Sequence, residues 1–163
     1  MKIRAATRED LSPIGEIYGH YVRTTPATFD LEPPPLEAWQ EEFEEHVAAG
    51  PYDLLVAVAH DTILGWAKTG PWRERKAYAT SAQVTAYCAP GATRRGIGRA
   101  LYEELFRVSG ARGFHRAYAA ITLPNDASAA LHERFGFTHI GTMHEVGSKF
   151  GRYWDVAQYE KEL

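Results

Sequence analysis

The hydrophobic and polar positions of the chain follow two periods, one typical of helices and one typical of strands. Before residue 50, the helical period predicts two amphipathic helices. Their apolar stripes consist of Leu11, Ile14, Ile17, Tyr18 and Tyr21, and of Leu36, Trp39, Phe43 and Val47. Thr7, with Asp10 three residues later, predicts the start of the first helix, and Gly50-Pro51 predicts the end of the second.

Short apolar runs predict that strands make up most of the remaining chain. These strands span residues 2–6, 53–59, 62–68, 80–88, 114–122, 138–146 and 153–159. Gly70-Pro71 is expected to end the strand 62–68. One further helix follows the strand 80–88, and another follows Asn125 and ends at Gly136. The order of these elements predicts a mixed α/β fold in a single domain, residues 1–163.

The segment between the first two helices, residues 24–35, is predicted to be a loop because it contains four prolines. Phe29 is its single aromatic residue. A lone aromatic side chain in a loop stiffened by prolines either covers a pocket or packs onto the core. Both interpretations of Phe29 are open from the sequence.

The amino-acid composition excludes several classes of protein. The 163 residues are 45% hydrophobic with a net charge of −3, so the basic excess typical of nucleic-acid binding is absent. A single cysteine, Cys88, excludes an internal disulfide and a cysteine-based zinc site and fits a reducing, cytoplasmic compartment. No signal peptide and no apolar run of membrane-spanning length is visible. The seven histidines lack acids at ligand spacing, so we expect no metal.

The stretch from Tyr87 to Leu101, YCAPGATRRGIGRAL, carries the clearest chemical signal. A strand passes through a basic, glycine-containing loop into a helix, whose first N–H groups lack helical partners. The helix dipole and three arginines favour an anion there, and the glycines allow a phosphate close to the backbone. The arginines are Arg94, Arg95 and Arg99, and the glycines are Gly96 and Gly98. The alternative is an ordinary strand–helix junction with surface arginines.

A basic segment precedes the strand 80–88. Arg73, Arg75, Lys76 and Tyr78 lie close together there and could bind the carboxylate or phosphinate of a small substrate through charge-assisted hydrogen bonds. Solvated basic side chains on a loop are the alternative interpretation.

Several motifs in the same order along the chain resemble the GCN5-related N-acetyltransferase (GNAT) superfamily, and within it the phosphinothricin and methionine sulfoximine acetyltransferases. They include Arg94 to Leu101, Leu123-Pro124-Asn125-Asp126, Leu131-His132-Glu133 and Gly147-Ser148-Lys149-Phe150-Gly151. The resemblance implies a mixed, mostly antiparallel sheet with central splayed parallel strands flanked by helices. It also implies transfer of an acetyl group from acetyl-CoA to the amine of a small amino-acid-like acceptor, and commonly a homodimer.

The resemblance also implies roles for particular residues. The cofactor-binding residues would be Ala86, Tyr87 and Cys88 at the pantetheine, Arg94, Arg95, Gly96, Ile97, Gly98 and Arg99 at the pyrophosphate, and Asn125 and Arg134 along the cofactor. The acceptor pocket would be lined by Arg75, Lys76, Ala77, Tyr78 and Gln83. His132 stands where relatives carry a proton-transfer residue. For Asn125 a helix N-cap, and for His132 packing on a helix face, are the alternative interpretations.

Gln83 departs from the pattern of these relatives, which carry a glutamate at this position that is regarded as the base. A neutral amide cannot take a proton at physiological pH. Gln83 therefore either positions the amine while His132, a water chain or solvent takes the proton, or the enzyme is slow or altered in substrate. The alternatives are an acetyltransferase for another amine, such as a polyamine, an aminoglycoside or a protein N-terminus, and a weakly catalytic acetyl-CoA-binding domain.

Overall fold

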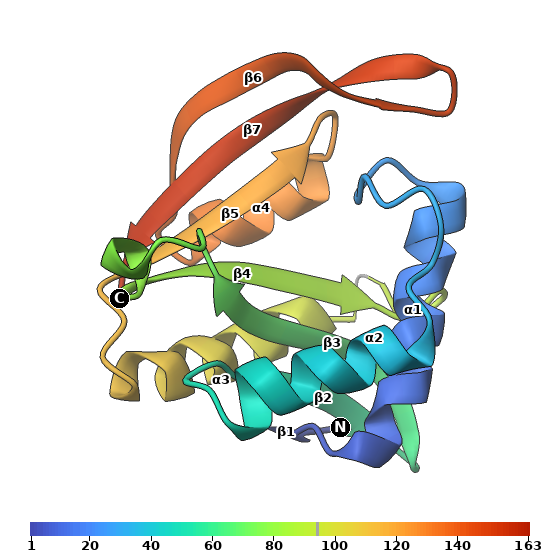
Figure 1. Cartoon of the computed structure of the whole chain (residues 1–163). Helices are drawn as coiled ribbons and strands as arrows, with labels where there is room; N and C mark the ends of the chain where they lie inside the picture. The colour runs from blue at the N-terminus through green and yellow to red at the C-terminus, as the bar shows by residue number, and fades with distance from the viewer. Residues whose placement is uncertain (94) are drawn as a thin grey trace.

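The structure is a computed structural model that describes residues 1–93 and 95–163. Its strands form one seven-stranded sheet in the order β1-β2-β3-β4-β5-β7-β6 (Figure 1). The strands are β1 (Lys2–Ala5), β2 (Leu54–Ala59), β3 (Thr62–Pro71), β4 (Ser81–Cys88), β5 (Arg116–Thr122), β6 (Thr138–Lys149) and β7 (Arg152–Glu162). The helices are α1 (Leu11–Thr24), α2 (Leu36–Glu42), α3 (Ile97–Ala111) and α4 (Asp126–Arg134). Short helical turns add η1 (Arg8–Asp10), η2 (Phe43–Ala48) and η3 (Lys76–Tyr78).

The centre of the sheet opens between β4 and β5, its single parallel pair among the described residues. These strands pair only at Ser81↔Arg116, Ala82↔Ala117 and Gln83↔Tyr118, and their arrows then diverge (Figure 1). Every other neighbouring pair of strands is antiparallel. The structure thus confirms the predicted mixed, mostly antiparallel sheet with splayed central strands.

Helices cover both faces of the sheet, with α1 and α2 on one side and α3 and α4 on the other (Figure 1). Successive side chains of a strand point to opposite faces. Trp66 on β3 accordingly packs with Ile14 and Trp39 of the α1–α2 layer, while the next residue, Ala67, packs with Leu101 of α3. The opening between β4 and β5 is therefore lined from both helical layers.

Local sequence signals explain most of the element ends. The predicted cap is confirmed, because the N–H of Thr7 donates to the Asp10 carboxylate over 2.7 Å, and the Arg4 guanidinium also binds that carboxylate. The second predicted helix is α-helical only to Glu42 and continues as the π-helical turn η2.

The predicted limits of three strands were too short. The strand that begins at Thr62 does not end before Gly70-Pro71, because Gly70 and Pro71 pair with Gln83 and Ala82 of β4. The last two strands also extend beyond the prediction. They pair up to Lys149↔Arg152, so only Phe150 and Gly151 form the turn. Cross-strand pairing thus overrides the local preference of glycine and proline for turns.

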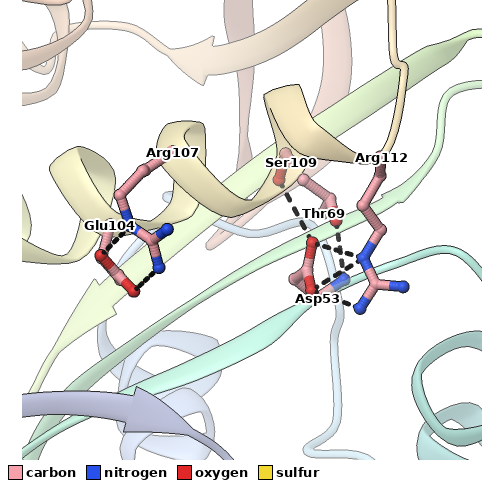
Figure 2. Close-up of polar contacts among 6 residues, drawn as sticks. All are labelled: Asp53, Thr69, Glu104, Arg107, Ser109 and Arg112. Carbon is pink, nitrogen blue, oxygen red and sulfur yellow. Dashed lines mark hydrogen bonds and ion pairs between the residues drawn. The ribbon is translucent and has the colours of Figure 1, made fainter.

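A buried carboxylate holds α3 on the sheet (Figure 2). Asp53, just before β2, accepts hydrogen bonds from Arg112 Nη2 at 2.8 Å and from Ser109 Oγ at 3.4 Å. The N–H of Asp53 in turn donates to Thr69 Oγ1 of β3 over 2.9 Å. These bonds anchor the C-terminal end of α3 to the sheet.

None of the helices that the structure describes is both long and apolar enough to cross a membrane.

Candidate active site

A cavity of about 1170 Å³ passes through the opening between β4 and β5. Its walls come from α1, α2 and the loop between them, from strands β3 to β7, and from α3 and α4. Buried polar atoms without partners are rare in folded proteins. In the described part of the chain, side-chain atoms of this kind occur on Trp39, His46, Trp66 and Gln158, and all four residues line this cavity. These four atoms are closed off from solvent, so they lie behind the cavity wall and do not face a ligand in it.

One end of the cavity is the N-terminus of α3. Gly96, Ile97, Gly98 and Arg99 all line it. Gly96 is the N-cap residue at φ +77°, a left-handed conformation that glycine adopts without strain. The first N–H groups of α3 therefore face the cavity with the positive end of the helix dipole. This geometry suits an anion such as a pyrophosphate.

The arginines of the predicted anion site differ in their position relative to the cavity. Arg99 lines the cavity, and its Nε forms an exposed ion pair with Glu103 at 2.8 Å. Arg95 is exposed and lies outside the cavity lining. Arg94 lies outside the described residues. The roles predicted for Arg94 and Arg95 stay predictions.

The middle of the cavity is bounded by the edge of β4 beyond Gln83. Strand residues alternate the direction of their N–H and C=O groups. Because Ala89 N–H donates to Leu64 O of β3, and Tyr87 O faces Gly65 of β3, Ala86 and Cys88 direct their backbone groups toward the opening. The Tyr21 hydroxyl donates to Cys88 O over 2.7 Å. Ala86 and Cys88 are thus placed to pair with an extended, amide-containing arm.

Cys88 packs against the α3 side of the core. Burial raises the pKa of its thiol, although a backbone hydrogen bond from Gly98 acts in the opposite direction. A thiol with a raised pKa is a poor nucleophile. The environment of Cys88 is therefore that of a small, partly buried residue at the core.

His132 of α4 is buried against α3 and lines the cavity together with Tyr102. Its Nδ1 lies 2.7 Å from the carbonyl oxygen of Ser128, and its Nε2 lies 3.0 Å from the Tyr102 hydroxyl. A carbonyl only accepts, so Nδ1 carries the proton and donates to it. Nε2 of the neutral ring then accepts from Tyr102. Burial lowers the pKa of His132, which keeps the imidazole neutral.

Asn125 begins α4 at the cavity wall. Its Oδ1 accepts a hydrogen bond from the N–H of Ser128 over 3.2 Å, which confirms the predicted N-cap. Asn125 also lines the cavity, so both predicted roles are compatible with its position. Arg134, at the other end of α4, is exposed and outside the lining.

Gln83 lies where the sheet opens, because it is the last residue of β4 that pairs with β5. It is half-buried and lines the cavity. Gln158 of β7 also lines the cavity, and its partner in the pairing of β5 with β7 is Ala120. Two neutral amides thus line the cavity near the point of divergence, whereas the Glu160 carboxylate, which lies across Tyr118 from Gln83 in the sheet, is not part of the lining.

The end of the cavity next to α1 and α2 is strongly aromatic. The ring of Tyr18 lies edge-on to Trp39, Trp66 and Tyr87, with centroid distances of 5.5, 6.1 and 5.3 Å. Sequence reasoning assigned Tyr18 and Trp39 only to the buried stripes of helices. The density of aromatic residues in those stripes was the signal that could have indicated a pocket wall.

The carboxylates at this aromatic end were also missed. Asp30 and Glu42 both line the cavity, and Glu42 forms an ion pair with Lys68. Asp30 belongs to the predicted proline-rich loop, where the sequence analysis considered only Phe29. Phe29 itself lines the cavity and packs its ring against Gly147 of β6.

The residues predicted to bind the acceptor lie apart from this end. Arg75, Lys76, Ala77 and Tyr78 are exposed in and beside η3 and are not part of the cavity lining. Nearby, the Arg73 guanidinium lies over the Trp72 ring at 5.3 Å. The acceptor-binding role of these four residues stays a prediction.

A second concavity, of about 930 Å³, lies at the β1–β2 edge and is lined by Lys2, Arg4, Asp10 and His60 among others. It contains none of the residues predicted for the site. No group of three or more potential metal ligands occurs among the residues that the structure describes.

The comparisons with known proteins agree with this geometry. The profile of the Acetyltransferase (GNAT) family matches residues 14–137. A phosphinothricin N-acetyltransferase of Streptomyces coelicolor is 52% identical over 100% of this chain and 96% of its own length. The L-methionine sulfoximine/L-methionine sulfone acetyltransferase of Pseudomonas aeruginosa is 36% identical over 99% of this chain and 94% of its own.

A solved structure is similar over nearly the whole length. The GNAT superfamily phosphinothricin acetyltransferase from Sinorhizobium meliloti, in complex with AcCoA, has a TM-score of 0.95 and 32% identity, covering 99% of this chain and 88% of that chain. The chain belongs to the GNAT family, as the resemblance predicted. It is an acetyl-CoA-dependent N-acetyltransferase.

Proposed function

We propose that this chain, as one domain over residues 1–163, transfers the acetyl group of acetyl-CoA to the amine of a small amino-acid-like acceptor. Acceptors of this class are methionine sulfoximine, methionine sulfone and phosphinothricin. The observation that carries the proposal is the cavity through the opened sheet. It joins an anion-binding helix terminus at one end to an aromatic, carboxylate-bearing end at the other. The named activities of the full-length relatives support this choice of acceptor.

The residues around the opening suit acetyl-CoA. The N-terminus of α3, from Gly96 to Arg99, would hold its pyrophosphate. The backbone of Ala86 and Cys88 would pair with the pantetheine amides, and Asn125 would bind the same arm from α4. Acetyl-CoA supplies an activated thioester, and these contacts place its carbonyl at the opening beyond Gln83.

The reaction forms an N–C bond, breaks the C–S bond and moves one proton from the amine to the departing thiolate. Only the neutral amine attacks, so the ammonium first loses one proton to water, and a second proton leaves the nitrogen once the N–C bond has formed. Gln83 accepts a hydrogen bond from the amine and positions it. An N–H group on the opened edge of β4 stabilises the oxyanion.

His132 carries the proton, and Tyr102 connects it to the cavity. Nε2 of His132 is the unprotonated nitrogen, and its hydrogen-bond donor is the Tyr102 hydroxyl. After the N–C bond has formed, Tyr102 accepts the second proton of the nitrogen as it passes its own proton to Nε2, and the reverse transfer delivers that proton to the thiolate. The low pKa of His132 keeps Nε2 available at neutral pH.

A panel of acceptors, with free thiol release as the readout, tests this function. We expect turnover with methionine sulfone, methionine sulfoximine or phosphinothricin, and little with spermidine, an aminoglycoside or a peptide N-terminus. If acetyl-CoA binds but no amino-acid acceptor is acetylated, the proposal is wrong and the chain is a binding domain. If only spermidine, the aminoglycoside or the peptide is acetylated, the enzyme belongs to a different acceptor class.

We also propose that the protein acts as a homodimer in the cytoplasm. The β6–β7 hairpin exposes apolar side chains, with 50% of Ile140, 51% of Val146 and 55% of Phe150 accessible. Apolar side chains exposed along the length of a hairpin are candidates for burial in a protein interface. Analytical ultracentrifugation should give a dimer mass for the wild type and a monomer mass for Phe150→Asp. A monomeric wild type would refute the dimer.

A further inference from the structure

Lys68 of β3 brings a positive charge to the end of the cavity next to α1 and α2, which is called the acceptor end below. Among the described residues, Lys68 and Arg99 are the lysine and arginine residues of the cavity lining. Arg99 lies at the N-terminus of α3, where the pyrophosphate is proposed to bind. The Lys68 ammonium instead faces α2, because it lies 5.6 Å from the centre of the Trp39 ring and pairs with Glu42. Lys68 is therefore the cation nearest to a ligand at the acceptor end.

Lys68 and Gln83 are diagonal neighbours on one face of the sheet. Gln83 of β4 pairs with Gly70 of β3 in the register of the two strands. Lys68 precedes Gly70 by two residues, so its side chain points to the same face as that of Gln83. Neighbours of this kind are about 7–8 Å apart, within reach of a long side chain. The Lys68 ammonium can therefore bind a ligand that Gln83 also contacts.

Gly70 leaves room for that ligand between the two side chains. It lines the cavity directly opposite Gln83. A Cβ atom at Gly70 would meet nothing within 4 Å, so the space over its backbone is open. In an α-amino acid, one carbon atom separates the amine from the carboxylate. An acceptor whose α-carbon lies over Gly70 would place its amine at Gln83 and its carboxylate at Lys68.

The Lys68 ammonium has donors left for such a carboxylate. An ammonium group has three N–H donors, and the one hydrogen-bond acceptor that Lys68 contacts among the described residues is Glu42. Its contact with the Trp39 ring is electrostatic. The side chain of Lys68 is 23% exposed and that of Glu42 is 36% exposed, so the ammonium is the more enclosed partner of the pair. A hydrogen bond from a partly enclosed ammonium to a carboxylate is stronger than one between neutral groups.

We propose that Lys68 determines the specificity of the acceptor site by binding the α-carboxylate of the acceptor while Gln83 positions its amine. The enzyme then prefers α-amino acids over amines that lack a neighbouring carboxylate. This inference rests on the proposed function. It gives Lys68 the carboxylate-binding role that the sequence suggested for Arg75 and Lys76, which lie outside the cavity lining.

The test compares methionine sulfone with its carboxamide, in which an uncharged amide replaces the carboxylate. Both acceptors are assayed with the wild type, Lys68→Met and the control Lys161→Met. Lys161 of β7 is also half-buried and lies 4.5 Å from an aromatic ring, that of Phe106, but it is not part of the cavity lining. KM of each variant is divided by KM of the wild type for the same acceptor, so a difference in amine reactivity between the two acceptors cancels.

We expect Lys68→Met to raise KM for methionine sulfone by about tenfold or more, the effect of losing one charged hydrogen bond. KM for the carboxamide should change little, because this acceptor has no charge for Lys68 to bind. Lys161→Met should change KM for neither acceptor. An equal change in KM for both acceptors in Lys68→Met overturns the inference.

Two further variants separate binding of the acceptor from the structural effect of the ion pair. Glu42→Gln also breaks the ion pair but keeps the ammonium, so KM for methionine sulfone should fall because the competing carboxylate is gone. Lys68→Arg keeps the positive charge and should retain part of the preference for methionine sulfone. A rise in KM in Glu42→Gln as large as that in Lys68→Met would assign the effect to the ion pair and overturn the inference.

Calorimetric titration with methionine sulfone keeps the failure of the inference apart from that of the proposed function. If methionine sulfone is not acetylated but binds more weakly to Lys68→Met than to the wild type, only the proposed chemistry fails. Equal binding to both proteins overturns the role of Lys68, whether or not the acceptor is acetylated.

Discussion

The hydroxyl of Tyr102 on α3 lies 3.0 Å from Nε2 of His132 on α4, and this contact determines the state of the imidazole. Nδ1 is already committed to the Ser128 carbonyl at 2.7 Å, so Nε2 must be the acceptor. His132 alone could be a packed core histidine. Its position on the cavity wall, together with Tyr102, makes it a candidate for proton transfer.

Replacing His132 should therefore affect turnover more than cofactor binding. We expect His132→Ala to lower kcat by about 10² to 10⁴, the usual contribution of a positioned acid–base group. Tyr102→Phe should lower kcat by a smaller factor, because the imidazole remains but loses the hydroxyl that links its Nε2 to the amine. Steady-state kinetics and acetyl-CoA titration measure both effects. His115→Ala, on an exposed residue, is the control, and a loss below threefold in His132→Ala would return this residue to a packing role.

Burial of His132 also predicts how stability depends on pH. The pKa of His132 is lowered in the folded state, whereas in the unfolded chain it is about 6.5. The unfolded chain therefore binds the proton first as the pH falls. This contribution to stability is complete above pH ~6.5 and is lost as the pH falls through the folded-state pKa. Urea unfolding from pH 8 to pH 5 should show a smaller loss of stability for His132→Gln than for the wild type. Equal slopes would contradict the prediction.

Gln83→Glu tests whether a missing base limits turnover. A carboxylate at the point where β4 and β5 diverge should raise kcat/KM near neutral pH by about tenfold or more, since general bases contribute at least that much. The pH–rate profile should gain an ionisation in the acidic range. Gln158→Glu, the same change on another strand of the cavity wall, is the matched control. An unchanged rate and profile for Gln83→Glu would show that deprotonation of the amine is not limiting.

Gly147→Ala tests the contact between the proline-rich loop and β6. A Cβ atom at this position would overlap the Phe29 ring, so the ring and its loop must move. We expect KM for the acceptor to rise several-fold, because Phe29 and Asp30 both line the cavity, while KM for acetyl-CoA stays constant. The control is Gly141→Ala on the same strand, where a Cβ meets nothing within 4 Å. Equal KM values in both variants would show that the loop does not shape the acceptor site.

Asp53→Ala should destabilise the fold. The substitution leaves Ser109 and Arg112 without their acceptor (Figure 2), and loss of a buried, charged hydrogen-bond acceptor costs about 1–3 kcal/mol. Urea unfolding measures this change. Glu104→Gln removes an ion pair that is exposed on the same helix and should leave the free energy of unfolding unchanged. A wild-type midpoint in Asp53→Ala would mean that this network does not hold α3.

Local sequence patterns were sufficient to predict several parts of the fold and the site. The apolar stripes of α1 and α2, the Thr7–Asp10 cap and the Asn125 N-cap all depend on residues within a few positions of one another. The anion-binding start of α3, from Gly96 to Arg99, is similarly local, because its free N–H groups and the helix dipole follow from the start of the helix itself. Such features are visible in a sequence because their partners are neighbours along the chain.

Contacts between residues far apart in the sequence decided the remaining features of the fold and the site. β3 continues through Gly70-Pro71 because β4 pairs with it, and Asp30 reaches the cavity only because Tyr18 and Lys149 hold its loop. Arg75 and Lys76 precede β4 in sequence, yet they lie outside the cavity lining.

The sequence by itself determined the family, the order of elements and the anion-binding start of α3, since these reside in local motifs. Only the tertiary structure decided which side chains share the cavity with Gln83 and which nitrogen of His132 is free to accept a proton. Both depend on close packing between segments far apart in the chain, and no local period encodes such packing.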